Sequence, residues 1–193
     1  MNEKKKISIY DVVAVAIMAA VVFVVTMFLS IRIPTPTGTT MIKLANAFIL
    51  MAGILLGGWR GGLAAGLGSM FFDLMTPEYV PEAWITFIRF FLMAYICGVI
   101  AHAGGAQGRS NGRNIVASII AALFSSVFYA AKNIIVLMIA GSAFGPAFVA
   151  NIPKLVTSLP NVVIAVVVTA VLTPILRRAL ASTNFYRQIG MQQ

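Results

Sequence analysis

The residues from Val12 to Leu29 form an apolar run in which Thr26 is the single polar side chain. A helix rises about 1.5 Å per residue, so about 20 apolar residues are needed to cross the hydrocarbon core of a bilayer. A run of this length predicts a membrane-spanning helix. No small-residue cleavage site closes the run before Pro34, and we therefore interpret it as a retained helix and not as a secretory signal.

The rest of the chain has the same character. Hydrophobic residues make up 60% of the 193 residues and charged residues 10%, which is too little polar surface to cover a water-soluble globule. Including the first, the apolar runs cover about 11–31, 44–59, 61–75, 84–103, 114–141 and 155–176. We therefore predict an all-α integral membrane protein with six transmembrane helices in one bundle. Its predicted parts are a basic cytoplasmic N-terminus (1–10), a transmembrane domain (11–180) and a cytoplasmic tail (181–193).

The second and third runs are short, and a glycine-rich stretch at 57–62 separates them. A helix of 15 residues reaches only about 22 Å. These two helices would therefore recruit flanking residues, thin the bilayer or pack inside the bundle. The glycine-rich stretch can be interpreted either as a tight turn or as the tip of a re-entrant hairpin.

The net charge of +9 lies in the gaps between the apolar runs and not on one basic surface, so it reports membrane topology and does not predict nucleic-acid binding. Lys and Arg close to a span stay on the cytoplasmic side. With both termini inside, most of the fourteen basic residues are cytoplasmic. The exceptions are Arg32, Lys43, Arg89, Lys132 and Lys154. We predict a multi-pass membrane protein with both termini in the cytoplasm.

The sequence offers little catalytic or metal-binding chemistry. Cys97 is the single cysteine and His102 the single histidine, so neither a thiolate cluster nor a Ser-His-Asp set can be assembled. The phosphate-binding pattern G-x-x-x-x-G-K-[ST] and the zinc pattern H-E-x-x-H are both missing. We therefore predict no catalytic residue, no metal, no cofactor and no enzymatic activity.

Small residues recur at helical spacing. In lipid, helices associate through close backbone approach at such residues. Ala16 and Ala20, with Ala19 beside them, form a smooth strip on the first helix. It can be either a docking face for another membrane protein or internal packing. The repeated small pairs between residues 53 and 69 favour packing inside the bundle.

Polar residues inside the predicted spans are costly and are hypotheses of function by default. Mapped onto the topology, six of them lie at similar depth in the outer part of the bundle: Asn46, Asp73, Arg89, Lys132, Asn133 and Asn161. Aromatic residues that could stack on a flat ligand lie around them, at Tyr79, Trp84, Tyr129, Phe144 and Phe148. We predict a pocket that opens to the outside. The alternative is a buried ion pair of Asp73 with Arg89 or Lys132, with Trp84 and Tyr79 in an interfacial aromatic belt.

Three stretches resemble the substrate-binding S components of energy-coupling factor (ECF) vitamin transporters. Ala16-x-x-x-Ala20 is similar to the motif that docks on the coupling subunit in that family. The stretch at 44–47, the glycine-rich stretch at 55–69 and Asp73-Leu74 are similar to the second and third helices of the riboflavin and hydroxymethylpyrimidine branch. Pro81, Thr86 and Arg89 fit the opening of its fourth helix.

The resemblance implies a function and a set of partners. An S component captures a vitamin outside, closes its first loop over it and topples in the membrane to deliver it. A transmembrane coupling subunit and two cytoplasmic ATPases drive this movement. Here Ala16, Ala19 and Ala20 would dock on the coupling subunit, and no nucleic acid is implied. The expected substrate-binding residues are Asn46, Asp73, Tyr79, Trp84, Arg89, Tyr129, Lys132, Asn133, Lys154 and Asn161.

The closing loop would be residues 32–43, whose prolines stiffen it and whose Gly38 permits a turn; it can also be interpreted as an exposed linker. Asp73, Asn133 and Asn161 suit the hydroxyl and ring-nitrogen pattern of hydroxymethylpyrimidine or pyridoxine. Pantothenate, through its carboxylate, and riboflavin are alternatives. A free-standing secondary carrier and a membrane-embedded enzyme or assembly factor are further alternatives.

Overall fold

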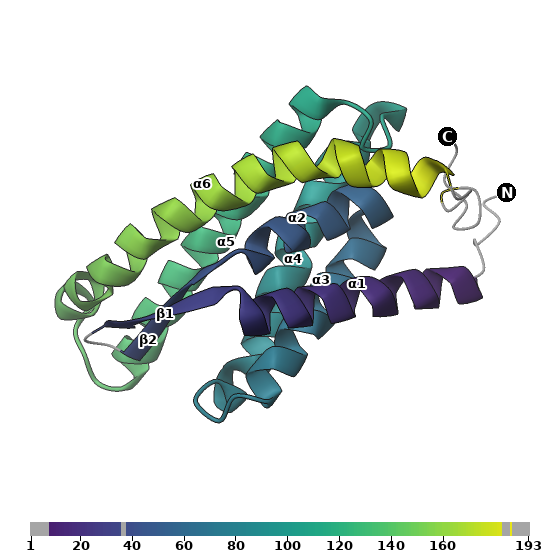
Figure 1. The fold of residues 1–193 in the computed structure, drawn as a ribbon. Helices are drawn as coiled ribbons and strands as arrows, with labels where there is room; N and C mark the ends of the chain where they lie inside the picture. Colours follow the sequence, from purple (N-terminus) through teal and green to yellow (C-terminus); the bar gives the residue numbers. More distant parts are fainter. Residues whose placement is uncertain (1–7, 36–37, 183–185, 187–193) are drawn as a thin grey trace, which may run out of the picture.

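The computed structural model describes residues 8–35, 38–182 and 186, and within these ranges the chain is mainly helical. The α-helices are α1 (Ile9–Phe28), α2 (Ala45–Leu56), α3 (Gly58–Leu74), α4 (Ala83–His102), α5 (Asn111–Ile139) and α6 (Phe144–Ser182). The other elements are the strands β1 (Ser30–Thr35) and β2 (Gly38–Lys43) and the 3-10 helices η1 (Val80–Glu82) and η2 (Ala103–Gly105). The start of α1 and the end of α6 lie at one end of the bundle, and the β1–β2 hairpin lies toward the other (Figure 1).

Four segments of the described chain are long and apolar enough to cross a membrane: Ile9–Phe28, Val80–Gly105, Asn111–Ile139 and Phe144–Ala181. Helix α2 is apolar but has 12 residues, which corresponds to about 18 Å. Helix α3 has 17 residues. The mainly helical membrane fold is therefore confirmed, whereas spanning by α2 and α3 and the cytoplasmic position of both termini stay predictions. The predicted segments 1–10 and 181–193 lie mostly outside the described residues.

The predicted closing loop is a β-hairpin. Strands β1 and β2 pair antiparallel, from Ser30 opposite Lys43 to Thr35 opposite Gly38. The turn residues 36–37 lie outside the described residues. The sequence analysis did not expect strands, because the two prolines of this segment were interpreted as turn residues. Pro34 is tolerated because the sheet has only two strands, so the edge of β1 that faces away from β2 needs no partner.

Helix α6 is longer than predicted. It starts at Phe144 and continues to Ser182, whereas the apolar pattern predicted a span at 155–176. Pro153, Pro160 and Pro174 lie inside it. Prolines are tolerated in membrane helices because neighbouring helices and polar side chains satisfy the freed backbone groups. The early start places Lys154 on the helix and not in a loop.

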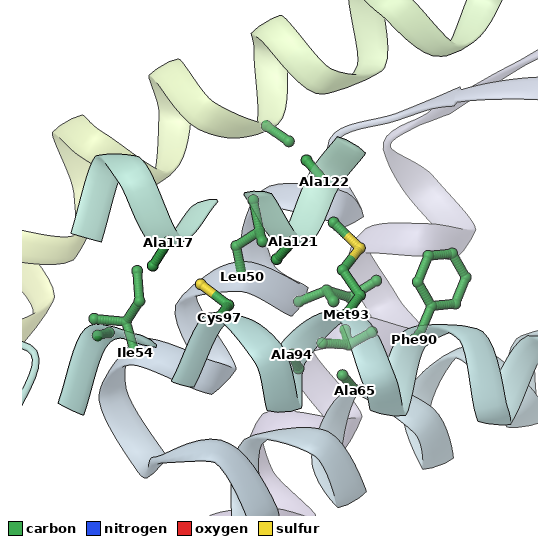
Figure 2. Packing of buried hydrophobic residues seen from close by; sticks show 14 residues of the cluster. Leu50, Ile54, Ala65, Phe90, Met93, Ala94, Cys97, Ala117, Ala121 and Ala122 are labelled. Carbon is green, nitrogen blue, oxygen red and sulfur yellow. The ribbon is translucent and has the colours of Figure 1, made fainter. Parts of the chain in front are cut away.

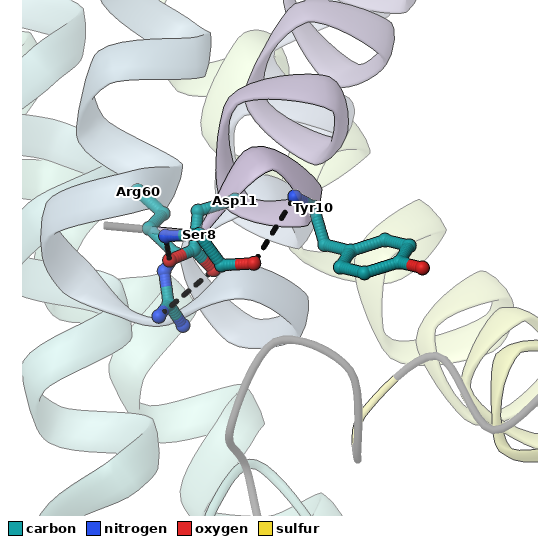
Figure 3. A network of polar contacts seen from close by, with 4 residues as sticks. All are labelled: Ser8, Tyr10, Asp11 and Arg60. Atoms are coloured by element: carbon teal, nitrogen blue, oxygen red, sulfur yellow. Dashed lines mark hydrogen bonds and ion pairs between the residues drawn. The ribbon is translucent and has the colours of Figure 1, made fainter. Parts of the chain in front are cut away.

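The glycine-rich stretch between α2 and α3 is a tight turn. Gly57 has φ 83° and ψ 168°, a conformation that glycine alone adopts readily. The start of α1 is fixed to this turn. Ser8 and Asp11 form a capping box, and Arg60 Nη2 lies 3.0 Å from Asp11 Oδ1 (Figure 3).

Helix α2 is the centre of the bundle, since all of its residues except Phe48 are buried. Its side chains meet α4 and α5 in one apolar cluster (Figure 2). Many of the partners are small. Figure 2 shows Leu50 and Ile54 of α2 together with the small residues Ala94, Cys97, Ala117 and Ala121 of α4 and α5. Small residues leave room for the backbones to approach closely, which is how helices associate in lipid.

Glycines make the closest helix contacts. Gly53 of α2 lies against the backbone of Ala94 and Gly98 in α4, and Gly68 of α3 lies against the backbone of Ala19 in α1. A Cβ atom at any of these glycines would collide with backbone atoms. The prediction that the small pairs of this region pack inside the bundle is confirmed.

Replacing Gly98 with alanine is expected to lower the free energy of unfolding by about 1–3 kcal/mol or more, the usual cost of overpacking. The new Cβ would lie 2.5 Å from the backbone nitrogen of Gly58, which cannot move without displacing α3. Gly112→Ala in the first turn of α5 is the control, because a Cβ there meets nothing within 4 Å. Alanine favours the helix by up to about 1 kcal/mol. Thermal melting in detergent should separate the two variants, and equal melting temperatures would contradict the packing described here.

Candidate functional site

A cavity of about 240 Å³ lies between the hairpin and the ends of the helices next to it. Strand β2 closes one side and α2, α3, α4, α5 and α6 form the others. Its helical lining follows the period of an α-helix. Helix α4 contributes Thr86, Arg89, Phe90 and Met93, α5 contributes Ala122, Ser125, Ser126, Tyr129 and Asn133, and α6 contributes Lys154, Ser158, Asn161, Val162 and Ala165.

Eight of the ten residues that the sequence analysis selected for substrate binding line this cavity. They are Asn46, Asp73, Tyr79, Arg89, Tyr129, Asn133, Lys154 and Asn161. They come from five helices and the segment before η1, so the fold joins residues that are more than a hundred positions apart. Of the six polar residues expected at similar depth, all except Lys132 line this cavity, and their depth in the membrane stays a prediction.

Two selected residues lie elsewhere. The Trp84 side chain points outward and is 62% exposed, which fits an aromatic residue at the membrane interface. Lys132 does not line the cavity; its Nζ pairs with Glu82 Oε1 at 2.7 Å. Phe144 and Phe148, expected to surround the pocket, are also exposed, and they stack on each other at the start of α6.

Asp73 does not form the ion pair with Arg89 or Lys132 that was the structural alternative. The salt bridges among the described residues join Arg60 to Asp11 and Lys132 to Glu82. Asp73 is 4% exposed, and the hydroxyl of Thr86 hydrogen-bonds to its carboxylate. A buried carboxylate held by a hydroxyl keeps acceptor capacity for a ligand in the cavity.

Arg89 is fixed in one orientation. Its Nε donates to the carbonyl oxygen of Ser125 at 3.2 Å and to the Ser125 hydroxyl at 2.9 Å. The guanidinium lies 4.7 Å from the centre of the Phe90 ring and 4.6 Å from that of Tyr129, which are cation–π distances. These hydrogen bonds use Nε and not the terminal nitrogens, and Arg89 lines the cavity.

Lys43, the last residue of β2, is the most important lining residue that the substrate-binding prediction missed. Its Nζ lies 5.3 Å from the centre of the Phe72 ring and 5.8 Å from that of Phe90. Burial lowers the pKa of the Lys43 ammonium to about 8, although the nearby Asp73 carboxylate acts in the opposite direction. A cation held this way gains from an anion placed beside it.

Asn161 of α6 fastens the hairpin over the cavity. Its Oδ1 accepts a hydrogen bond from the backbone N–H of Lys43 at 2.8 Å, and its Nδ2 donates to the carbonyl oxygen of Met41 at 2.8 Å. The amide thus pairs with β2 much as a neighbouring strand would. Thr40 and Thr157 add a contact of 3.5 Å between their hydroxyl oxygens. The amide of Asn161 is therefore engaged by the chain itself.

Among the other polar lining residues, Lys154 and Asn133 have hydrogen-bond partners, whereas the side-chain oxygen of Asn46 does not. Lys154 Nζ donates to Asn133 Oδ1 at 3.4 Å, and the Asn133 Nδ2 donates to the carbonyl oxygen of Tyr129 at 2.9 Å. Asn46 is 9% exposed, and its Oδ1 is buried without a hydrogen-bond partner in the described part of the chain. A buried acceptor without a partner costs about 1–3 kcal/mol, which a ligand donor would recover.

Some of the remaining lining residues could have been found from helical periodicity. Thr86 precedes Arg89 by three positions, and Ser158 precedes Asn161 by three, so each pair shares a helix face. The hairpin residues Thr39, Thr40 and Met41 had no such signal. Their placement depends on the pairing with β1 and on the contact with Asn161, which the sequence alone does not show.

The family model of the ECF-type riboflavin transporter S component matches residues 6–178. The chain belongs to this family. Members are the substrate-binding membrane subunits of ECF transporters, so the resemblance to an S component is confirmed, whereas the branch stays a prediction. A search of curated proteins returned no match.

The fold agrees with that of a solved S component. A structure described as "Structure and mechanism of the S component of a bacterial ECF transporter" matches with a TM-score of 0.56 and 19% sequence identity. The match covers 90% of this chain and 96% of the other. At this identity the likeness shows the S-component fold and says nothing about the substrate.

The first helix of this S component presents two of its three predicted docking residues. Ala16 and Ala20 are exposed on α1, whereas Ala19 is 8% exposed, with its backbone against Gly68 of α3. The strip therefore has two faces: Ala16 and Ala20 look outward, and Ala19 belongs to the internal packing of α1 on α3.

Replacing Asn161 with leucine is expected to loosen the hairpin of the S component, because the backbone N–H of Lys43 and the carbonyl of Met41 lose their partners. Two hydrogen bonds of this kind contribute about 1–3 kcal/mol together, so amide hydrogen exchange across residues 38–44 should accelerate about tenfold or more. Ser158→Ala is the control, since its hydroxyl bonds only within α6, to the carbonyl of Lys154. Unchanged exchange in the Asn161 variant would show that the hairpin is held by other contacts.

Proposed function

We propose that this chain is the high-affinity substrate-binding subunit of an ECF-type importer that takes up a small vitamin or vitamin precursor. The observation that carries the proposal is the polar cavity under the hairpin, at the end of the bundle opposite the start of α1 and the end of α6. Buried charged and amide side chains in a membrane protein mark a substrate site, and this site lies in a chain of a family whose members bind substrates.

In this proposal the cavity faces the outside, both termini are cytoplasmic, and α2 and α3 complete six membrane-embedded helices. The hairpin is the element that closes over the vitamin, since β2 supplies part of the cavity wall and is fastened by Asn161. A transmembrane coupling subunit and two cytoplasmic ATPases would supply the energy for delivery.

The size of the cavity bears on the substrate. Its volume of about 240 Å³ is below the range of about 300–1,000 Å³ that is usual for drug-sized ligands. This favours a compact vitamin or precursor, such as hydroxymethylpyrimidine, pyridoxine or pantothenate, over the tricyclic riboflavin. The family description names riboflavin transport, and riboflavin therefore belongs in any test.

A thermal-shift screen of the purified chain in detergent against B vitamins and their precursors tests the proposal. A ligand at a hundred times its dissociation constant stabilises the folded state by about 2.7 kcal/mol, so one member of the set should raise the melting temperature clearly. Mass spectrometry of the released ligand should show an unmodified vitamin. The absence of any shift, or release of a chemically altered product, would contradict the proposal.

Introducing tryptophan at Ala16 and Ala20 is expected to abolish uptake while leaving vitamin binding intact. Both side chains are exposed on α1, so the larger rings would block a partner helix without disturbing the bundle. Val167→Trp is a matched control, because Val167 is exposed on α6 and 55% accessible. Uptake by cells and binding by the purified subunit are the two measurements. Unimpaired uptake in the double variant would exclude this face as the docking site.

A further inference from the structure

The lining of the cavity places two cations against one buried carboxylate. The cations are Lys43 and Arg89, which are partly buried. Asp73 is the buried carboxylate of the lining, whereas Glu78 is exposed. The third lining carboxylate, that of Glu82, is 42% exposed and already pairs with Lys132 outside the cavity. Positive charge therefore exceeds negative charge among the unpaired groups that are at least partly buried, and such an excess is costly unless an anion balances it.

Both cations lie near the same aromatic ring. Lys43 Nζ is 5.8 Å and the central guanidinium carbon of Arg89 is 4.7 Å from the centre of the Phe90 ring. The structure shows no salt bridge to either group within the described part of the chain. The aromatic rings beside the two cations compensate only part of their lost hydration. The part of the cavity next to Phe90 therefore favours a negative ligand group.

The geometry of Arg89 suits a carboxylate in particular. Ser125 holds Nε and the guanidinium lies near two rings, so the group has a fixed orientation, and none of these contacts uses its terminal nitrogens. A planar guanidinium binds a planar carboxylate through two parallel hydrogen bonds, which a neutral hydroxyl or amide cannot reproduce. Lys43 would add a point charge on the hairpin side.

A second, independent feature points to a donor on the same ligand. Asn46 Oδ1 at the start of α2 is a buried acceptor that lacks a partner among the described residues. It lines the same cavity as Arg89 and Lys43. A hydroxyl or N–H on the ligand would satisfy it.

We propose that the substrate is a small carboxylic acid with at least one hydroxyl or N–H donor, whose carboxylate binds Arg89 and Lys43 and whose donor binds Asn46. This inference rests on the proposed function and deepens it. It shifts the preference from the neutral hydroxymethylpyrimidine and pyridoxine to an organic anion of similar size.

Matched pairs of probes test the proposal on the full-length chain in detergent or nanodiscs. Each pair shares a skeleton and differs in charge: pantothenate and pantothenol, nicotinate and nicotinamide, pyridoxate and pyridoxine. Pyridoxine phosphate tests a phosphate in place of a carboxylate. An acid of at least one pair should raise the melting temperature and bind in calorimetry, and its neutral partner should bind at least about tenfold more weakly, the usual cost of losing a charge-assisted hydrogen bond.

Several results would overturn the proposal. One is tighter binding of a neutral probe than of its acid, or equal binding of the two; another is binding of the phosphate without any acid. In these cases the vitamin-binding function stands and only the charge assignment falls. If neither an acid nor a neutral vitamin binds, the proposed function itself fails and the inference fails with it.

Variants test whether Arg89 and Lys43 bind the carboxylate. Arg89→Gln should weaken binding of the acid by about ten- to hundredfold and bring its affinity close to that of the neutral partner. Arg178→Gln, at an exposed position near the far end of α6, should change neither. If Arg89→Gln does not fold, as judged by its melting curve without ligand, Lys43→Gln supplies the same comparison. Unchanged affinity for the acid in the folded variant would contradict the assignment.

The pH dependence is a second measurement. Lys43 faces Arg32 from β1, Asp73 from α3 and Arg89 from α4, and its pKa is about 8. Lys43 is charged below that pH and loses its proton above it, so affinity for the acid should be constant from pH 6 to about 7.5 and fall above pH 8. In Lys43→Gln this fall should disappear. A fall that persists in the variant would assign the pH dependence to another group.

Discussion

The structure depends on how closely the backbones of α2, α3 and α4 approach one another. In lipid, apolar side chains gain nothing by leaving the solvent for a neighbouring helix, so packing must come from contact itself. Gly53, Gly61 and Gly98 allow carbonyl and amide groups of adjacent helices to meet where a methyl group would collide. This packing makes a rigid centre from a helix of 12 residues that could not cross a bilayer on its own.

The rigid centre positions a site that is costly to keep empty. Helix α2 presents Asn46, α3 presents Asp73 and α4 presents Arg89 to one cavity, and each is held by packing or by a hydrogen bond from a neighbour. Because the supporting groups are already in place, a ligand need not order them on binding. Pre-organisation of this kind favours high affinity from a small contact area.

Much of the fold and of the site could be predicted from the sequence. The polar residues were found because lipid makes them conspicuous, and their shared depth followed from counting along each apolar run. The sequence did not indicate the hairpin, and the role of Lys43, which ends β2, was missed with it. The early start of α6 was also missed. Pro34 and Pro153 indicate turns in water, yet here one lies in an edge strand and the other inside a helix. Trp84 and Lys132 were misplaced because depth alone does not tell which side of a helix faces the cavity.

Lys43 belongs both to the β1–β2 hairpin and to the charged lining of the cavity. The residue ends β2, and its backbone N–H is one of the two groups that Asn161 holds. Any movement of the hairpin that breaks this contact also carries the Lys43 ammonium away from Phe72, Phe90 and the cavity. Under the proposed function, opening of the hairpin would therefore lower the positive potential of the cavity and weaken the binding of an anion in the same step.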